Sequence, residues 1–76
     1  MKEILETIIR NIVEDQESVT IAEQVEEKNN TYSVKVAEAD MGRVIGKQGK
    51  TAKAIRMIMK SVAAKEHKKI VIEFED

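Results

Sequence analysis

Residues 44–51 read Val44-Ile45-Gly46-Lys47-Gln48-Gly49-Lys50-Thr51, and this stretch decides the fold. Two glycines stand three positions apart, between an apolar dipeptide and a segment with the apolar spacing of a helix. A glycine has no Cβ, so the chain can bend sharply there and another molecule's backbone can approach closely. The bend comes where a helix begins, and the amides and positive dipole end of a helix favour an anion. The stretch therefore predicts a clamp for a sugar-phosphate chain, with RNA as the expected ligand.

Charge is distributed unevenly around this bend. The formal net charge is −1, yet all fourteen acidic residues and only six of the thirteen basic ones lie outside residues 41–65. Positive potential is thus concentrated around the glycines, which favours a polyanionic ligand. A solvated helix face is the alternative interpretation of these charges. The seven basic residues of this region are Arg43, Lys47, Lys50, Lys53, Arg56, Lys60 and Lys65.

Length and composition limit the class of protein. A chain of 76 residues forms one domain, 1–76, near the lower size at which a single core is stable. It has no cysteine, which excludes disulfides and thiolate metal sites. No apolar run approaches the ~20 residues of a membrane helix, and the first residues lack the apolar centre of a signal peptide. We expect a soluble cytoplasmic protein without cofactor, metal, membrane association or small-molecule substrate.

Apolar periodicity outlines six elements. It predicts a helix over 2–14, a strand over 18–26, a strand over 31–37, a short helix over 41–45 with Asp40 as its N-cap, and a helix over about 50–65. Ile70, Ile72 and Phe74 alternate in a final strand. Asparagines tolerate left-handed backbone, so Glu27-Lys28-Asn29-Asn30 is expected to form a hairpin turn.

Two helices between the second and third strands form a crossover, which makes those strands parallel. The expected fold class is α+β, in the order α-β-β-α-α-β, with three helices on one face of a three-stranded mixed sheet. The other face of the sheet should be exposed to solvent and carry Thr31, Ser33, Lys35, Glu73 and Glu75.

The residues Val44-Ile45-Gly46-Lys47-Gln48-Gly49, followed by Ile55, resemble the signature of the KH domain, and the element order resembles its type II form. The run from Met41 to Thr51 with Ala54-Ile55-Arg56 is similar to the small bacterial single-KH proteins of the KhpA family, over the full length. The resemblance implies a cytoplasmic RNA-binding protein and RNA chaperone, whose loop holds about four nucleotides of single-stranded RNA. It also implies pairing with a larger KH protein, KhpB, and effects on cell-wall growth and cell length.

The candidate RNA-binding residues fall into three groups. Gly46 and Gly49 let phosphates approach the main chain, while Lys47, Gln48 and Lys50 add charge or hydrogen bonds. The groove rim is assigned to Arg43, Lys53 and Arg56, and the apolar floor to Val44, Ile45 and Ile55. The alternatives are a tight turn between helices, solvated charges and core packing, respectively. Close packing of the short helix is the favoured explanation of a further glycine, Gly42.

Base stacking on aromatic rings is not expected. Tyr32 and Phe74 are the only aromatic residues, and both alternate with the core pattern. The hairpin residues Lys28, Asn29 and Asn30 flank the groove in type II KH domains.

An enzyme is not expected. Gly49-Lys50-Thr51 matches the end of a nucleotide-binding P-loop, but that motif needs a glycine where Val44 stands. His67 is the only histidine and neighbours lysines, so it predicts a solvated turn residue and not a metal ligand.

The main rival to RNA binding is a protein-interaction module. The residues Met57, Ile58, Met59 and Val62 offer more apolar surface than one buried stripe needs, and methionines suit adaptable contacts. We therefore expect a homodimer, a heterodimer with a KhpB-like protein, or both, through the later part of the long helix.

Overall fold

The chain folds into three α-helices and three strands, joined by three 3₁₀ turns. A computed structural model describes residues 1–75. Its order is α1 (Lys2–Ile12), η1 (Gln16–Ser18), β1 (Thr20–Val25), β2 (Asn29–Lys35), η2 (Glu38–Asp40), α2 (Met41–Ile45), η3 (Lys47–Gly49), α3 (Lys50–Lys65) and β3 (Lys69–Glu75). The predicted element order is confirmed, and the bounds of α2 and α3 agree with it. The helix α1 ends two residues early because Val13 is extended, with φ −85° and ψ 155°.

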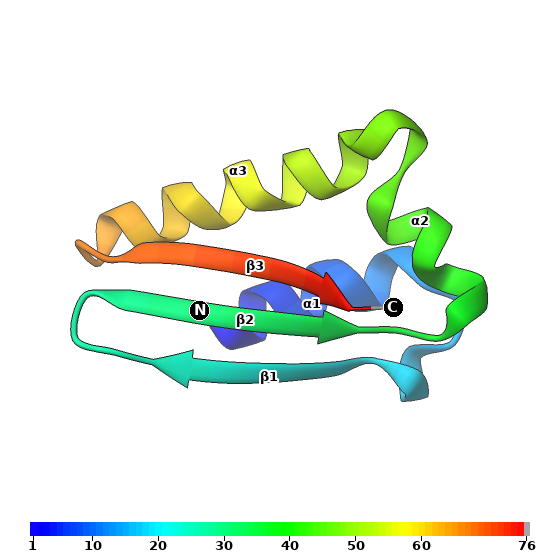
Figure 1. Cartoon of the computed structure of the whole chain (residues 1–76), viewed down its shortest axis with the longest axis horizontal. Coiled ribbons are helices and arrows are strands. Elements are labelled where there is room, and N and C mark those ends of the chain that lie inside the picture. The colour runs from blue at the N-terminus through cyan, green and yellow to red at the C-terminus, as the bar shows by residue number, and fades with distance from the viewer. Residues whose placement is uncertain (76) are drawn as a thin grey trace.

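The three strands form one mixed sheet in the order β1-β2-β3. The strands β1 and β2 pair antiparallel, with Ile21 opposite Val34, and β2 and β3 pair parallel, with Val34 opposite Phe74. In Figure 1 the sheet lies in front of α1, and α3 runs beside the free edge of β3. Lys35, Glu73 and Glu75 are exposed on the other face, as expected. The α+β fold of a type II KH domain is therefore confirmed.

The core lies between the sheet and the helices. Each α-helix and each strand contributes apolar side chains to this core. Within residues 1–75, no helix is long and apolar enough to cross a membrane. The largest fully buried side chains are those of Tyr32, Leu5, Ile9, Met59, Val34 and Val44.

Three polar side chains are linked by hydrogen bonds on the side of the sheet that the helices cover. The hydroxyl of Tyr32 is fully buried, donates to Glu23 Oε2 over 2.7 Å and accepts from Asn30 Nδ2 over 3.2 Å. Burial raises the pKa of Tyr32 to about 12, and the hydrogen bond to Glu23 acts in the same direction. Glu23, which breaks the apolar alternation of β1, therefore serves as the hydrogen-bond acceptor of a core tyrosine.

The hairpin between β1 and β2 forms, but not by the predicted turn. Asn29 and Asn30 are the first residues of β2, and neither has a positive φ. The Glu26 N–H donates to the Asn29 carbonyl over 2.8 Å, so the turn spans residues 26–29 and has Glu27 and Lys28 at its centre. The prediction of left-handed asparagines is wrong because strand pairing takes both residues, Asn29 opposite Lys69 and Asn30 opposite Val25 and Ile70.

Candidate nucleic-acid interface

The bend between α2 and α3 depends on glycine at position 46. Gly46 has φ 78° and ψ 171°, a conformation that only glycine adopts readily. A Cβ on Gly46 would lie 2.7 Å from the amide nitrogen of Thr51 and 2.6 Å from its Cβ. Position 46 therefore excludes any side chain, because the chain folds back onto the first turn of α3.

Gly49 differs from Gly46 in having open space around it. It is left-handed, with φ 75° and ψ 12°, and stands directly before α3. A Cβ added to Gly49 would meet no atom within 4 Å. The N–H groups of Gly49 and Lys50 already donate to the carbonyls of Gly46 and Lys47, so a ligand that approaches from this side meets the positive dipole end of α3 and the later amides of its first turn.

Gly42 does not have the role expected for it. A Cβ added to Gly42 would meet nothing within 4 Å, and the residue is exposed in α2. The prediction that Gly42 allows close packing of the short helix is therefore wrong, because no neighbouring atom comes near it.

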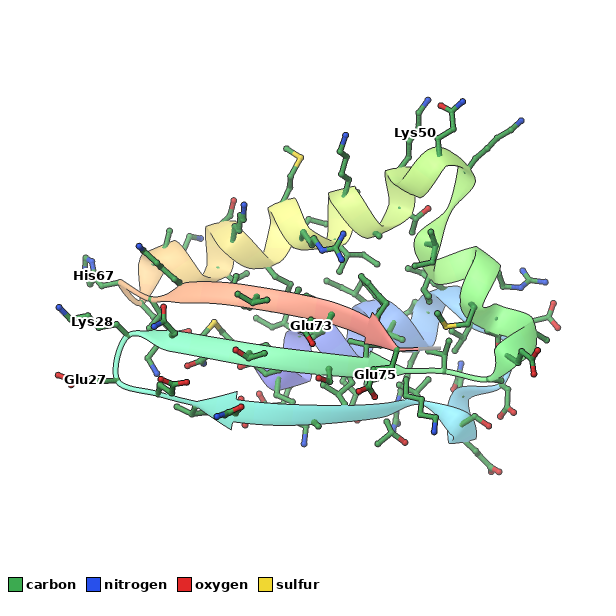
Figure 2. The ribbon with its side chains drawn as sticks, viewed as in Figure 1. Glu27, Lys28, Lys50, His67, Glu73 and Glu75 are labelled. Carbon is green, nitrogen blue, oxygen red and sulfur yellow. The ribbon has the colours of Figure 1, made fainter. Side chains whose placement is uncertain are left out.

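Polar side chains surround the bend. Lys47, Gln48 and Lys50 are all exposed, and Gln48 has a left-handed backbone with φ 58° and ψ 25°. Figure 2 shows Lys50 projecting away from the body of the molecule at the start of α3. Lys53 is exposed one turn further along the helix. These side chains are free to face a ligand at the bend.

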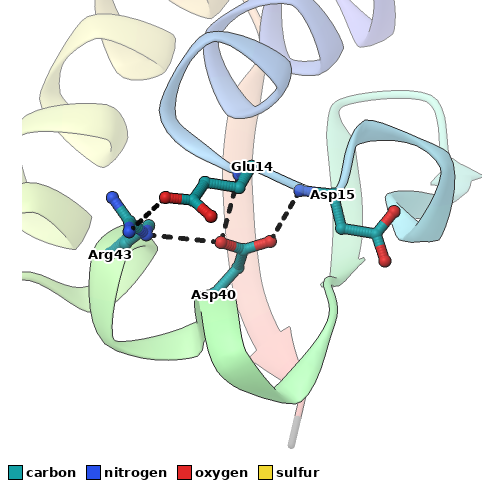
Figure 3. Close-up of polar contacts among 4 residues, drawn as sticks. All are labelled: Glu14, Asp15, Asp40 and Arg43. Carbon is teal, nitrogen blue, oxygen red and sulfur yellow. Dashed lines mark hydrogen bonds and ion pairs between the residues drawn. The ribbon is translucent and has the colours of Figure 1, made fainter.

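Arg43, predicted at the groove rim, is engaged elsewhere. Its Nη2 lies 2.7 Å from Glu14 Oε1, and its Nε lies 3.4 Å from Asp40 Oδ1 (Figure 3). These two carboxylates compensate the guanidinium charge. Arg43 is thus a weaker ligand for phosphate than the lysines of the bend.

Asp40 is the residue that ties α2 to the segment after α1. Its buried carboxylate accepts the N–H groups of Glu14 over 3.1 Å and of Asp15 over 3.0 Å (Figure 3). The N–H of Asp15, that of Glu14 and the charge of Arg43 lower the pKa of Asp40 below its ordinary value, against the opposite effect of burial. Asp40 precedes α2 as predicted, but its side chain makes no capping bond. The capping role is wrong because the distant amides take both oxygens.

The residues predicted to form the apolar floor are largely buried. Val44 is 0% exposed and Ile55 is 2% exposed, so neither side chain offers a surface to a base. Ile45 is half-buried and packs against the core. Both Val44 and Ile55 belong to the core cluster, so the alternative interpretation, core packing, accounts for both, and their contact with a base stays a prediction.

The space between α3 and the free edge of β3 is the candidate for the groove. A hollow of about 160 Å³ is lined by Arg56, Lys60, Ile70, Val71 and Ile72. Of these, only Arg56 was a predicted site residue. The sequence signal for Ile70, Val71 and Ile72 is the unbroken apolar run at 70–72. Val71 is an apolar residue at a position that alternation places on the solvent-exposed face, and its side chain is 50% exposed.

The predicted dimer surface is only partly on the surface. Met57 is 69% exposed and Ile58 49% exposed, and Val62 is half-buried. Met59 is fully buried beside Leu5 and Ile9 in the core cluster, so it is removed from that surface. An exposed apolar pair on the outer side of α3 remains.

His67 is exposed and ends α3 as a turn residue. Its backbone is left-handed, with φ 58°, and the N–H groups of His67 and Lys68 donate to the carbonyls of Ala64 and Ala63. This is the Schellman arrangement of a helix end. Within residues 1–75, no three side chains of the metal-binding types His, Asp and Glu gather to hold an ion.

Comparison with known proteins agrees with the geometry. The family model of the KhpA/KhpB KH domain matches residues 2–74. A protein of Clostridium acetobutylicum named RNA-binding protein KhpA is 47% identical over 73 residues, covering 96% of this chain and 97% of the relative. Proteins with the same name from Listeria monocytogenes and Chlamydia trachomatis are 42% and 40% identical, each over 96% of this chain and over 96% and 94% of their own length. No solved structure matches. The chain belongs to the KhpA/KhpB family of KH domains.

Proposed function

We propose that this protein binds single-stranded RNA and holds about four nucleotides, with the phosphates at the Gly46-Lys47-Gln48-Gly49 bend. The observation that carries the proposal is the open space at Gly49, where nothing stands within 4 Å of an added Cβ. A phosphate can therefore reach the amides at the start of α3, while Lys47, Gln48 and Lys50 are exposed around it. The relatives named as RNA-binding proteins support the same ligand class.

The bases are proposed to lie in the hollow between α3 and β3. Ile70, Val71 and Ile72 supply its apolar floor, and Arg56 and Lys60 stand on the helix side. In the described sheet, the edge of β3 that faces α3 pairs with no strand. Arg56 Nε takes the Ile72 carbonyl, and the other main-chain groups of this edge can bond to base edges. No aromatic ring lines this hollow, which favours contact with aliphatic side chains over stacking.

Binding, and not catalysis, is the proposed activity. The P-loop alternative needs a glycine at position 44, where the fully buried Val44 packs in the core. Turnover of ATP by the pure protein would contradict this part of the proposal.

A double substitution of the bend tests the phosphate clamp. Lys47→Asp with Gln48→Asp places two negative charges against the phosphates, and we expect RNA binding to be lost while the fold persists. The matched control is Lys2→Asp with Gln16→Asp, which changes the same residue types at the start of α1 and in η1. A gel-shift titration should show binding by the control alone. Equal affinity of both variants would refute the clamp.

Self-association through α3 is the second proposed function. The exposed pair Met57 and Ile58, with the half-buried Val62, supports a homodimer or a heterodimer with a KhpB-like protein. A dimer joins two weak grooves and gains affinity through effective concentration. Sedimentation should show a dimer that Met57→Glu with Ile58→Glu converts to a monomer. A wild-type monomer at concentrations on the order of tens of micromolar contradicts self-association.

Family membership supports a finer role, which we include in the proposal. It is that of a cytoplasmic RNA chaperone that acts with a KhpB-like partner in cell-wall growth and cell-length control. Deletion of the gene should alter cell length, and a gene carrying the Lys47→Asp and Gln48→Asp changes should fail to restore it. Restoration by that variant would separate the cellular role from RNA binding.

A further inference from the structure

The groove does not end at the hollow beside Arg56. A second, wider hollow of about 410 Å³ is lined by Asn29, Lys60, Lys68, Lys69, Ile70 and Val71. It shares Lys60, Ile70 and Val71 with the first hollow. The two are therefore parts of one groove, which follows the edge of β3 from Ile72 back to the beginning of that strand.

The charge of the β3 side changes sign along this groove. Residues 69, 71, 73 and 75 of β3 face the open side of the sheet, and they are Lys69, Val71, Glu73 and Glu75. Carboxylates thus stand near the end of β3 and a lysine near its start. Phosphates along the groove are repelled by the sheet at one end and attracted at the other.

The basic end of the groove is held in place by the adjoining turns. The Lys69 N–H donates to the Lys28 carbonyl over 2.9 Å, and Lys68 Nζ lies 3.4 Å from Asn30 Oδ1. Figure 2 shows Lys28 and His67 at this end of the molecule, opposite Lys50, with Glu27 as an acidic neighbour. Among residues 1–75, neither Lys60 nor Lys69 has a carboxylate within 4.0 Å. Their ammonium groups are available to a ligand.

We infer that Lys60, Lys68 and Lys69 form a second phosphate-binding subsite for single-stranded RNA, beyond the nucleotides that the glycine bend holds. The inference rests on the proposed function. Lys50 and Lys60 are ten residues apart on α3, a distance of about 15 Å along the helix axis. A strand held at the bend must continue over this length, past the hollow beside Arg56, before its phosphates meet Lys68 and Lys69. The affinity should therefore depend on the length of the RNA.

The experiment compares a uridine tetramer with a uridine decamer by NMR titration, which measures weak binding. The test variant is Lys60→Gln with Lys69→Gln, which replaces two charged side chains with neutral polar ones and leaves the hydrogen bond between Lys68 and Asn30 in place. The control, Arg10→Gln with Lys35→Gln, removes the same charge from α1 and from β2. Thermal melts verify that both variants fold. The decamer can bind in more registers than the tetramer, which raises its apparent affinity. This increase is the same for the wild type, the test variant and the control.

We expect the test variant to lose several-fold more affinity for the decamer than for the tetramer, while the control binds both like the wild type. The slope of log affinity against log salt should fall by about 1.4 for the decamer, since each phosphate contact on a single strand contributes about 0.7. Unchanged decamer binding overturns the inference and leaves the glycine bend intact. An equal loss for both oligomers, or an equal loss in the control, also overturns it. Failure of the wild type to bind either oligomer refutes the proposed function itself.

Discussion

Arg56 of α3 donates a hydrogen bond from Nε to the main-chain carbonyl oxygen of Ile72 in β3, over 3.2 Å. Its guanidinium carbon also lies 5.2 Å from the centre of the Phe74 ring. One side chain thus links the helix to the strand edge across the groove. Because the Ile72 carbonyl is already occupied, a base at this level meets guanidinium donors in place of a free acceptor.

Substitution of Arg56 should weaken RNA binding in a graded way. Arg56→Met keeps an apolar stem but removes the charge and the bond to Ile72. Arg56→Lys keeps the charge without the planar fork of donors. We expect the methionine variant to bind more weakly than the lysine variant, and the lysine variant more weakly than the wild type, in fluorescence anisotropy. Wild-type affinity of Arg56→Met would show that this residue takes no part in the groove.

Alanine at the three glycines should have three different effects on stability. At Gly46 it meets the Thr51 amide in a strained conformation, and we expect a loss of about 3 kcal/mol or failure to fold. At Gly49 only the left-handed backbone opposes it, with a cost of about 1–2 kcal/mol. At Gly42, in helical backbone and open space, it should stabilise by about 0.5–1 kcal/mol. Urea unfolding measures all three, and equal losses at Gly46 and Gly49 contradict this order.

Asp40 should make the fold sensitive to acid. Its pKa is lowered in the folded state, so the stabilisation is present above its ordinary value of 3.8 and is lost as pH falls through the lower, folded value. Asp40→Asn has one acceptor oxygen for two amides and does not titrate. The variant should be less stable than the wild type at neutral pH, with a smaller further loss in acid.

Thermal melts between about pH 6 and pH 2 compare the two proteins. Glu3, whose pKa is also lowered, is unchanged in both and contributes equally. Parallel stability curves for the wild type and Asp40→Asn would assign the acid sensitivity to other carboxylates.

Glycine in place of His67 should stabilise the end of α3. The residue has a left-handed backbone that a side chain disfavours by about 1 kcal/mol, and the Schellman bonds it supports use only main-chain atoms. Glu66 precedes it with φ −102°, so Glu66→Gly gains nothing from this effect and serves as the control. A rise in melting temperature is expected for His67→Gly alone, and no rise in either variant contradicts the account.

The sequence predicts this fold well because its local signals agree. The alternation at 32, 34 and 36 and the helical spacing from 52 to 62 each mark one element, and the length of the crossover fixes parallel pairing. The positive φ angles of Gly46 and Gly49 follow from the glycines themselves, whereas that of Gln48 has no local signal in the sequence. Glu23 shows the limit of local sequence patterns. It interrupts the apolar alternation of β1 because it accepts a hydrogen bond from the hydroxyl of Tyr32, nine residues away, which only the folded sheet brings near.

The candidate site was less predictable because burial and pairing are properties of the tertiary structure. Val44, Ile55 and Met59 are apolar at helical spacing, but spacing does not tell a groove floor from a core. Arg43 meets Glu14 across 29 positions, which no local pattern reveals. The hollow beside β3 was not predicted because alternation places Val71 on the solvent-exposed face of the sheet. In the fold, Val71 lines this hollow together with residues of the neighbouring helix α3.

The central claim is that RNA phosphates rest on the main-chain amides of the glycine bend. Titration of ¹⁵N-labelled protein with a short single-stranded RNA, followed by amide chemical shifts, tests it most directly. We expect the largest shift changes at residues 46–51, with smaller changes along 69–72. Changes confined to the open face of the sheet, with the amides of residues 46–51 unmoved at saturation, would contradict it.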